Sequence, residues 1–215
     1  MRLISVNVSL PRLVQWKGET VETGIFKEPR DGPVGVALSN LEGDRQADLT
    51  VHGGVDKAVY AYPAEHYPFW SRELSRTDLT WGMFGENLTT EGLDEATVRV
   101  GDRFLVGTAE LEVSQPRLPC YKLGIKFGRA DMVKRFLQSR RLGFYLRVLG
   151  EGTLAANDPI RRLGGDQGSV SIADLALLET TQREDVALLE RAVRAAALTE
   201  SWRLKYREHL ARLRS

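Results

Sequence analysis

Hydrophobic and polar positions alternate over much of the first two thirds of the chain, which predicts strands there. The alternation is clearest at residues 3–8, and further strand-like stretches follow at residues 35–41, 58–62, 97–114 and 143–149. The segment 14–26 predicts a hairpin that turns at Gly18. Because these strands are short and broken by glycine at close intervals, they favour a barrel or a small sandwich over a parallel α/β sheet.

Helices are predicted between some of these strands. One follows residues 58–62 and ends near Leu74, and either Pro63 or Pro68 opens it, since proline suits a first helical position. Two more helical patterns occupy residues 121–128 and 130–140. The predicted fold class is therefore α+β and mainly β.

The pattern changes at residues 161–168, where glycine, aspartate and glutamine predict a linker. From Ser169 onward the chain is rich in Ala, Leu, Glu and Arg and contains no proline or glycine. Apolar residues recur there at helical spacing, and Ser171 with the acid three positions later resembles a capping box. Three short helices are therefore predicted from about Ser171 to Leu213. The predicted domains are residues 1–163 and residues 169–215.

Composition narrows the class of protein. The chain has 215 residues, one cysteine and a formal net charge of +1. One cysteine excludes an internal disulfide and suits a reducing cytosol. No stretch approaches the ~20 apolar residues of a membrane helix, and the first residues lack the apolar core of a secretory signal. We therefore expect a cytoplasmic protein with no membrane partner.

Basic residues gather in the last predicted helix: Arg203, Lys205, Arg207, Arg212 and Arg214. Glutamates interrupt them and the whole chain is nearly neutral, so a solvated helix face is favoured over stable nucleic-acid binding. Apolar residues on the same helix, Trp202, Tyr206 and Leu210, are expected to pack either on the barrel or on a second subunit. A homodimer therefore stays open.

The densest polar run is residues 43–59, which holds more glycine, aspartate, arginine and histidine than a strand needs. The adjacent Gly53 and Gly54 let backbone N–H groups approach a ligand. Arg45 and Lys57 flank them and are able to neutralise a phosphate. A tight turn with surface charges is the alternative, but so many of these groups in one short segment favour anion binding.

Two further turns carry polar groups. The turn at residues 81–89 includes Asn87, although taken alone it has the pattern of a hairpin loop. The turn at residues 115–120 holds the single cysteine, Cys120, three positions after Arg117, and two prolines that precede the cysteine stiffen the backbone. A nearby cation favours the thiolate, so Cys120 is a candidate nucleophile or metal ligand. The competing interpretation is a buried thiol that only fills space.

Other site patterns are missing. The sequence has no Cys-x-x-Cys pair and no His-Glu-x-x-His motif, and its three histidines are far apart, so a zinc site is disfavoured. A P-loop, a Gly-x-Gly-x-x-Gly fingerprint and a Gly-x-Ser-x-Gly elbow are also absent.

The polar segments in this order resemble the MOSC domain, in its bacterial YiiM-like branch. The matching residues are Gly43–Asp48, His52–Gly54, Asp56–Tyr60, Gly85–Leu88, Gly101–Asp102, Gln115–Arg117, Pro119–Cys120, Gly143–Tyr145 and Arg147–Val148. The tail resembles the small three-helix domain that follows the MOSC domain in that branch. The likeness covers nearly the whole chain.

The resemblance implies a strand-rich β-barrel related to the pyruvate-kinase barrel domain, followed by a three-helix appendage. It also implies binding of the pterin-based molybdenum cofactor, with Cys120 as the metal ligand. A thiolate is a soft ligand of the kind that such a metal accepts beside dithiolene sulfurs. The implied cofactor-binding residues are Arg45, His52, Gly53, Gly54, Lys57, Asn87 and Arg117.

Relatives in this family reduce N-hydroxylated bases and amidoximes, so the resemblance implies a molybdenum-dependent oxidoreductase. No flavin, ferredoxin or haem motif is visible, and the electrons would come from a separate flavin- or iron–sulfur-type reductase. The alternative is a carrier of the molybdenum cofactor, or a sulfur-relay module that holds a persulfide on Cys120. Both use the same thiol, and only turnover of an N-hydroxylated substrate separates them.

Overall fold

The computed structural model describes residues 1–47 and 54–215. Its largest element is an eight-stranded sheet in the order β13-β9-β10-β11-β7-β8-β1-β4. The strands are β1 (Arg2–Val8), β4 (Glu28–Pro29), β7 (Val59–Pro63), β8 (Leu88–Glu91), β9 (Arg103–Val106), β10 (Ala109–Pro116), β11 (Phe144–Gly150) and β13 (Ile160–Gly164). All neighbours in this sheet are antiparallel except β7 and β8, which are parallel. The mixed fold is as predicted.

The two ends of this sheet approach each other without forming a continuous ladder. A single antiparallel bridge joins Arg2 of β1 to Pro159, just before β13. Backbone hydrogen bonds flank it: the N–H of Leu3 donates to Asp158 at 2.9 Å, and the N–H of Ile160 donates to Met1 at 3.0 Å. The closed barrel therefore stays a prediction, although the sheet curls far enough for its edges to touch.

Two smaller sheets complete the strand structure. A hairpin of β2 (Arg12–Trp16) and β3 (Glu19–Thr23) turns at Lys17 and Gly18, both with positive φ. This hairpin is the predicted one. The single strand predicted for residues 35–41 is wrong, because that segment folds back as β5 (Val34–Ala37) and β6 (Asn40–Leu41), with β12 (Gly152–Leu154) pairing on the other side.

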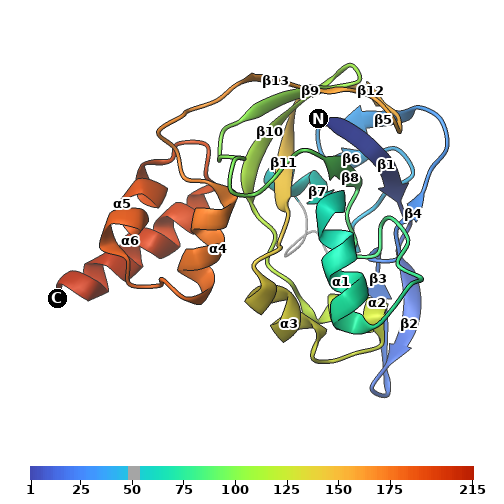
Figure 1. Ribbon diagram of the computed structural model, residues 1–215, viewed down its shortest axis with the longest axis horizontal. Helices are drawn as coiled ribbons and strands as arrows, with labels where there is room; N and C mark the ends of the chain where they lie inside the picture. The colour runs from blue at the N-terminus through green and yellow to red at the C-terminus, as the bar shows by residue number, and fades with distance from the viewer. Residues whose placement is uncertain (48–53) are drawn as a thin grey trace.

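Three helices pack beside the large sheet (Figure 1): α1 (Tyr67–Leu74), α2 (Tyr121–Phe127) and α3 (Met132–Ser139). Both candidate prolines are used at the start of the first one. Pro63 precedes a 3-10 turn over Ala64–His66, and Pro68 lies in the first turn of α1, where its missing N–H costs nothing. The helix ends at Leu74, as predicted.

The tail forms the three predicted helices, α4 (Ile172–Thr180), α5 (Val186–Arg194) and α6 (Glu200–Arg214). The capping box is present, with Ser171 and Asp174 bonding each other's backbone N–H. The linker prediction for residues 161–168 is wrong in its first half, because β13 continues through Gly164 at the edge of the sheet. None of the helices in the described ranges is long and apolar enough to cross a membrane.

The core has two parts. One lies inside the large sheet and continues without a break into the apolar faces of α4, α5 and α6. Trp202, Tyr206 and Leu210 are buried in it, so they pack within the chain rather than on a second subunit. The other part is rich in aromatic side chains and lies among α1, α2, α3 and β7. The division at residues 163 and 169 stays a prediction, because the first core extends across it.

Candidate functional site

A pocket lies where the polar turns meet the end of the hairpin. It is lined by Thr23, Gly24, Ile25, Lys27, Asp44, Arg45, Gln46, Ala47, Lys57, Tyr60, Gly85, Asn87, Arg117, Leu118, Cys120, Lys122 and Tyr145. Five predicted site residues therefore come together: Arg45, Lys57, Asn87, Arg117 and Cys120. Gly54 is exposed at φ 96° beside the Lys57 turn and does not line the pocket. The predicted His52 and Gly53 lie outside the described residues.

Cys120 reaches this pocket through the end of β10. The register between β10 and β11 shifts between Val113 and Gln115 and resumes with Gln115 opposite Tyr145 and Pro116 opposite Phe144. Such a bulge re-aims the end of a strand. Cys120 then takes an extended backbone conformation directly before α2 and is half-buried. The thiol is therefore not sealed in the interior, and the space-filling interpretation is not supported.

Arg117 is the most unusual side chain in the pocket. It is only 5% exposed, and its guanidinium carbon lies 5.3 Å from the centroid of Tyr60 and 5.1 Å from that of Phe136. Its Nη1 atom is buried and has no hydrogen-bond partner among the residues that the structure describes. Burial acts to lower the pKa of Arg117, but Tyr60, Tyr145 and the other neighbours outweigh it, so the pKa is raised and the charge is kept. An orphaned buried donor of this kind needs an explanation, and an anionic ligand supplies one.

The charges around the pocket favour an anion as well. Among the described residues, its lining carries five cations, Lys27, Arg45, Lys57, Arg117 and Lys122, but a single carboxylate, Asp44. That carboxylate is already in a close ion pair with Lys27. Burial lowers the pKa of Lys27, and Asp44 opposes this effect. Since the whole chain has a net charge of +1, the excess of positive charge is a local property of this pocket.

Asn87 braces the pocket from behind. Its Nδ2 donates to Asp44 at 2.9 Å and to the carbonyl of Asn7 at 3.3 Å, while its Oδ1 accepts from the N–H of Tyr60 at 3.1 Å. The amide thereby ties the polar loop to β1 and β7. Direct contact of Asn87 with a cofactor stays a prediction, since these bonds already use both of its polar groups.

The adjacent turn is held by Glu86. This buried carboxylate accepts hydrogen bonds from the N–H groups of Gly82 and Phe84 and from the hydroxyls of Tyr67 and Thr89. Burial raises the pKa of Glu86, and these donors oppose the shift. The turn therefore has a structural role, but the hairpin-loop interpretation is wrong, because the turn leads from α1 to β8 and does not join two antiparallel strands.

Arg147 fastens the turn that carries Lys57. Its Nε donates to Asp56 at 2.9 Å, its Nη1 donates to Glu112 at 2.7 Å, and its Nη2 donates to the carbonyl of Ala197 at 2.9 Å. One guanidinium thus joins the polar loop, the large sheet and the connection between α5 and α6. Three charge-assisted or carbonyl bonds from one fork give this junction a defined geometry.

Tyr60, Tyr145 and Lys122 are among the pocket residues that the sequence did not predict as site residues. Tyr60 and Tyr145 are register partners on β7 and β11, and their rings lie 5.4 Å apart. Both have a raised pKa because of burial, which Arg117 opposes, so both remain neutral phenols. Tyr60 and Tyr145 belong to the motifs of the family resemblance, and Lys122 follows Cys120 by two positions, but none of the three residues had a pattern that marked it as a site residue.

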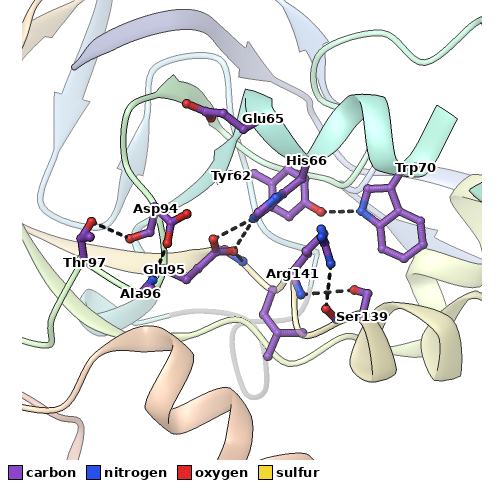
Figure 2. Close-up of polar contacts among 12 residues, drawn as sticks. Tyr62, Glu65, His66, Trp70, Asp94, Glu95, Ala96, Thr97, Ser139 and Arg141 are labelled. Carbon is purple, nitrogen blue, oxygen red and sulfur yellow. Dashed lines mark hydrogen bonds and ion pairs between the residues drawn. The ribbon is translucent and has the colours of Figure 1, made fainter. Parts of the chain in front are cut away.

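The described histidines outside the pocket have structural partners. Figure 2 shows His66 pointing at Glu95, whose two oxygens lie 2.8 and 2.7 Å from its Nε2. Glu95 also accepts from the N–H of Gly143 at 3.0 Å, which anchors the start of β11. His209 bonds the carbonyl of Arg183. No group of three or more metal-binding side chains occurs in the ranges 1–47 and 54–215, so a metal at Cys120 would take its other ligands from a cofactor.

Comparison with known proteins identifies the family to which this chain belongs. Residues 48–161 match the family model of the MOSC domain. The chain belongs to the MOSC-domain family. The match begins within the polar loop and includes Cys120, so the family resemblance and the pocket involve the same residues.

The sequence similarity to several known proteins extends over most of the chain. The uncharacterized protein YflK of Bacillus subtilis is 42% identical over 98% of this chain and 95% of its own length. The protein YiiM of Escherichia coli is 36% identical over 88% of this chain and 85% of its own. A protein named reductase from Gibberella moniliformis is 37% identical over 68% of this MOSC chain but only 26% of its own length. The crystal structure of YiiM from Geobacillus stearothermophilus superposes with a TM-score of 0.81 at 34% identity, covering 97% of this chain and 98% of that one.

Proposed function

We propose that this protein is a molybdenum-cofactor-binding oxidoreductase that reduces N-hydroxylated compounds. The observation that carries the proposal is the pocket itself, where the Cys120 thiol, the orphaned Nη1 of Arg117 and an excess of cations line one space. The cofactor combines a metal that accepts a thiolate with a phosphate that needs cations. Membership of the MOSC family and likeness to a protein named reductase support the same assignment.

The residues present fit the group. Cys120 would supply the protein ligand to the metal, and Arg45, Lys57 and Lys122 would hold the phosphate. Arg117 would donate to an anionic or oxo oxygen, which would satisfy its buried nitrogen. When bound, the cofactor would supply a two-electron redox centre for the reduction of the N–O bond.

The overall reaction converts an N–OH group, two electrons and two protons into an N–H group and water. The N–O bond breaks, the nitrogen is reduced, and a separate reductase is oxidised by two electrons. Tyr60 and Tyr145 form an aromatic wall next to Arg117, and as neutral phenols they keep water and stray charge away from the reacting groups.

The test is turnover of an amidoxime by protein made in a cofactor-competent host, with a reduced viologen as donor and metal content measured alongside. We expect about one molybdenum per chain and loss of activity in Cys120→Ser. Near-normal turnover by metal-loaded Cys120→Ser would reject the thiolate ligand. Persulfide on Cys120 with no turnover would replace the enzyme with the carrier or sulfur-relay alternative.

A further inference from the structure

Beside the pocket, two cations from distant parts of the chain share one aromatic ring. Phe26 follows the pocket-lining Ile25 directly and is half-buried. The guanidinium carbon of Arg12, on β2, lies 3.8 Å from the centroid of this ring, and the Nζ of Lys126, on α2, lies 5.2 Å from it. Figure 1 shows α2 next to the β2–β3 hairpin, so the two elements meet at this edge of the pocket.

Neither cation has an ion-pair partner in the part of the chain that the structure describes. Burial lowers the pKa of Lys126, and the charge of Arg12 acts in the same direction. The carboxylates of Glu28 and Glu86 oppose this shift from a distance, without forming an ion pair with Lys126. The repulsion between two positive charges at one ring is unfavourable unless an anion from outside the chain compensates for it.

The basic side of α6 shows the opposite arrangement. There Arg203, Lys205 and Arg214 form ion pairs with Glu200, Glu179 and Glu190, respectively. Exposed cations on α6 are therefore neutralised by carboxylates of the same chain. No described carboxylate forms such an ion pair with Arg12 or Lys126.

The two cations extend the positive charge of the pocket outward. Lys122 lines the pocket and lies one helical turn before Lys126, so both project from the same side of α2. Arg12, Phe26 and Lys126 do not line the pocket, and a ligand that fills the pocket leaves them uncovered. Next to Cys120 in the sequence, Tyr121 is 54% exposed and Leu118 is 38% exposed. An aromatic and apolar patch with a charged border is typical of a protein-docking surface.

We propose that the basic rim, formed by Arg12, Lys122 and Lys126, docks an acidic electron-carrier protein. The inference rests on the proposed function, which needs two electrons for each turnover and has no donor group of its own among the residues described. A carrier with carboxylates around its redox group would be attracted to this rim and oriented toward the pocket. Each turnover would oxidise the carrier by two electrons in total while N–OH becomes N–H and water.

The test uses the full-length protein loaded with cofactor, and the variant R12E/K126E. An amidoxime is reduced either with reduced viologen or with reduced acidic carriers, namely a flavodoxin and a [2Fe–2S] ferredoxin. We expect a KM for one of these carriers at least ~10-fold higher than in the wild type at low salt, and turnover with viologen within about twofold. Higher salt should raise the KM of the wild type and leave that of the variant nearly unchanged.

The matched control is K134E/R212E, which reverses two exposed cations that lie outside the rim and form no ion pair with any described residue. It should leave both reactions unchanged. If the KM for the carrier is unaltered in R12E/K126E, the docking proposal is rejected while the proposed function stands. The same holds if the wild-type protein accepts electrons from neither carrier. If R12E/K126E loses molybdenum or its activity with viologen, the docking proposal is also rejected, because Arg12 and Lys126 then serve cofactor binding. A wild type inactive with viologen would reject the proposed function, and the rim proposal with it.

Discussion

Arg117 shows how a single buried nitrogen distinguishes a ligand site from a structural one. Replacing it with Met removes the orphaned donor from cofactor-free protein, so we expect the free energy of unfolding to change by less than about 1 kcal/mol. Molybdenum occupancy should nevertheless fall roughly 10-fold, because a charge-assisted bond to the ligand is lost. Thermal melts of the cofactor-free protein and metal analysis of the loaded protein measure the two effects.

Arg99→Met is the control for this variant. Arg99 donates to the carbonyl of Ser169 at 2.7 Å, outside the pocket. Its loss should lower stability and leave the molybdenum content of folded protein unchanged. If Arg117→Met destabilises the protein more than Arg99→Met and keeps its metal, Arg117 is structural.

Lys27 and Asp44 give a second prediction at the residue scale. Both are buried and paired, so Lys27→Met leaves an uncompensated carboxylate and should cost about 3–5 kcal/mol of unfolding free energy. The double variant K27M/D44N should recover part of that loss, because the stranded charge is gone. Urea denaturation of the two variants measures the difference, and equal losses would contradict the coupling.

The sequence led to the right polar side chains for the pocket but missed its aromatic wall. Arg45, Lys57, Arg117 and Cys120 stood out because a strand or helix has no need of them. Tyr60 ends one of the motifs of the family resemblance, but by residue type it belongs to an alternating aromatic stretch, which predicts a core strand. Only the pairing of β7 with β11 places it opposite Tyr145, and such long-range pairing leaves no local signal.

At the scale of elements, the Lys57 turn depends on a junction with the C-terminal helices. Arg147→Ala removes its bonds to Asp56, Glu112 and Ala197. We expect the amides of residues 54–58 to exchange about 10-fold faster or more, since such bonds contribute about 1.5–3 kcal/mol each. Hydrogen exchange followed by mass spectrometry measures this, and unchanged protection would refute it.

Arg191→Ala is the matched variant for this junction. Arg191 joins Asp174 on α4 from its place on α5, so its loss perturbs the helices without touching the Lys57 turn. Exchange at residues 54–58 should remain as in the wild type. If both variants loosen the turn equally, the effect comes from the helices as a whole rather than from Arg147.

Elements were predicted well where the signal is local and poorly where it is not. The helices from α1 to α6 follow from periodicity, prolines and the capping box at Ser171. The turn of the β5–β6 hairpin at residues 38–39 has no glycine or proline, so the sequence predicts one strand there. The sequence predicts a linker at residues 161–164, since their place in the sheet depends on pairing with β9, more than fifty residues earlier.

For the whole molecule, the continuous core predicts one cooperative unit. Residues of the large sheet and of α4, α5 and α6 share one buried cluster. Calorimetry should therefore give a single unfolding transition, and a fragment ending at residue 168 should lose cooperative folding because that cluster is left open to water. Two separate transitions, or a fragment that melts like the full chain, would instead establish two independent domains.

The pocket also constrains when the protein becomes functional. Its walls come from segments between Thr23 and Tyr145, and the strands that carry them pair across long stretches of chain. A nascent chain that has not yet released Tyr145 from the ribosome therefore cannot present a complete receptacle. Any ligand of this pocket has to bind after these segments have emerged and paired, so every freshly made copy first passes through an empty stage.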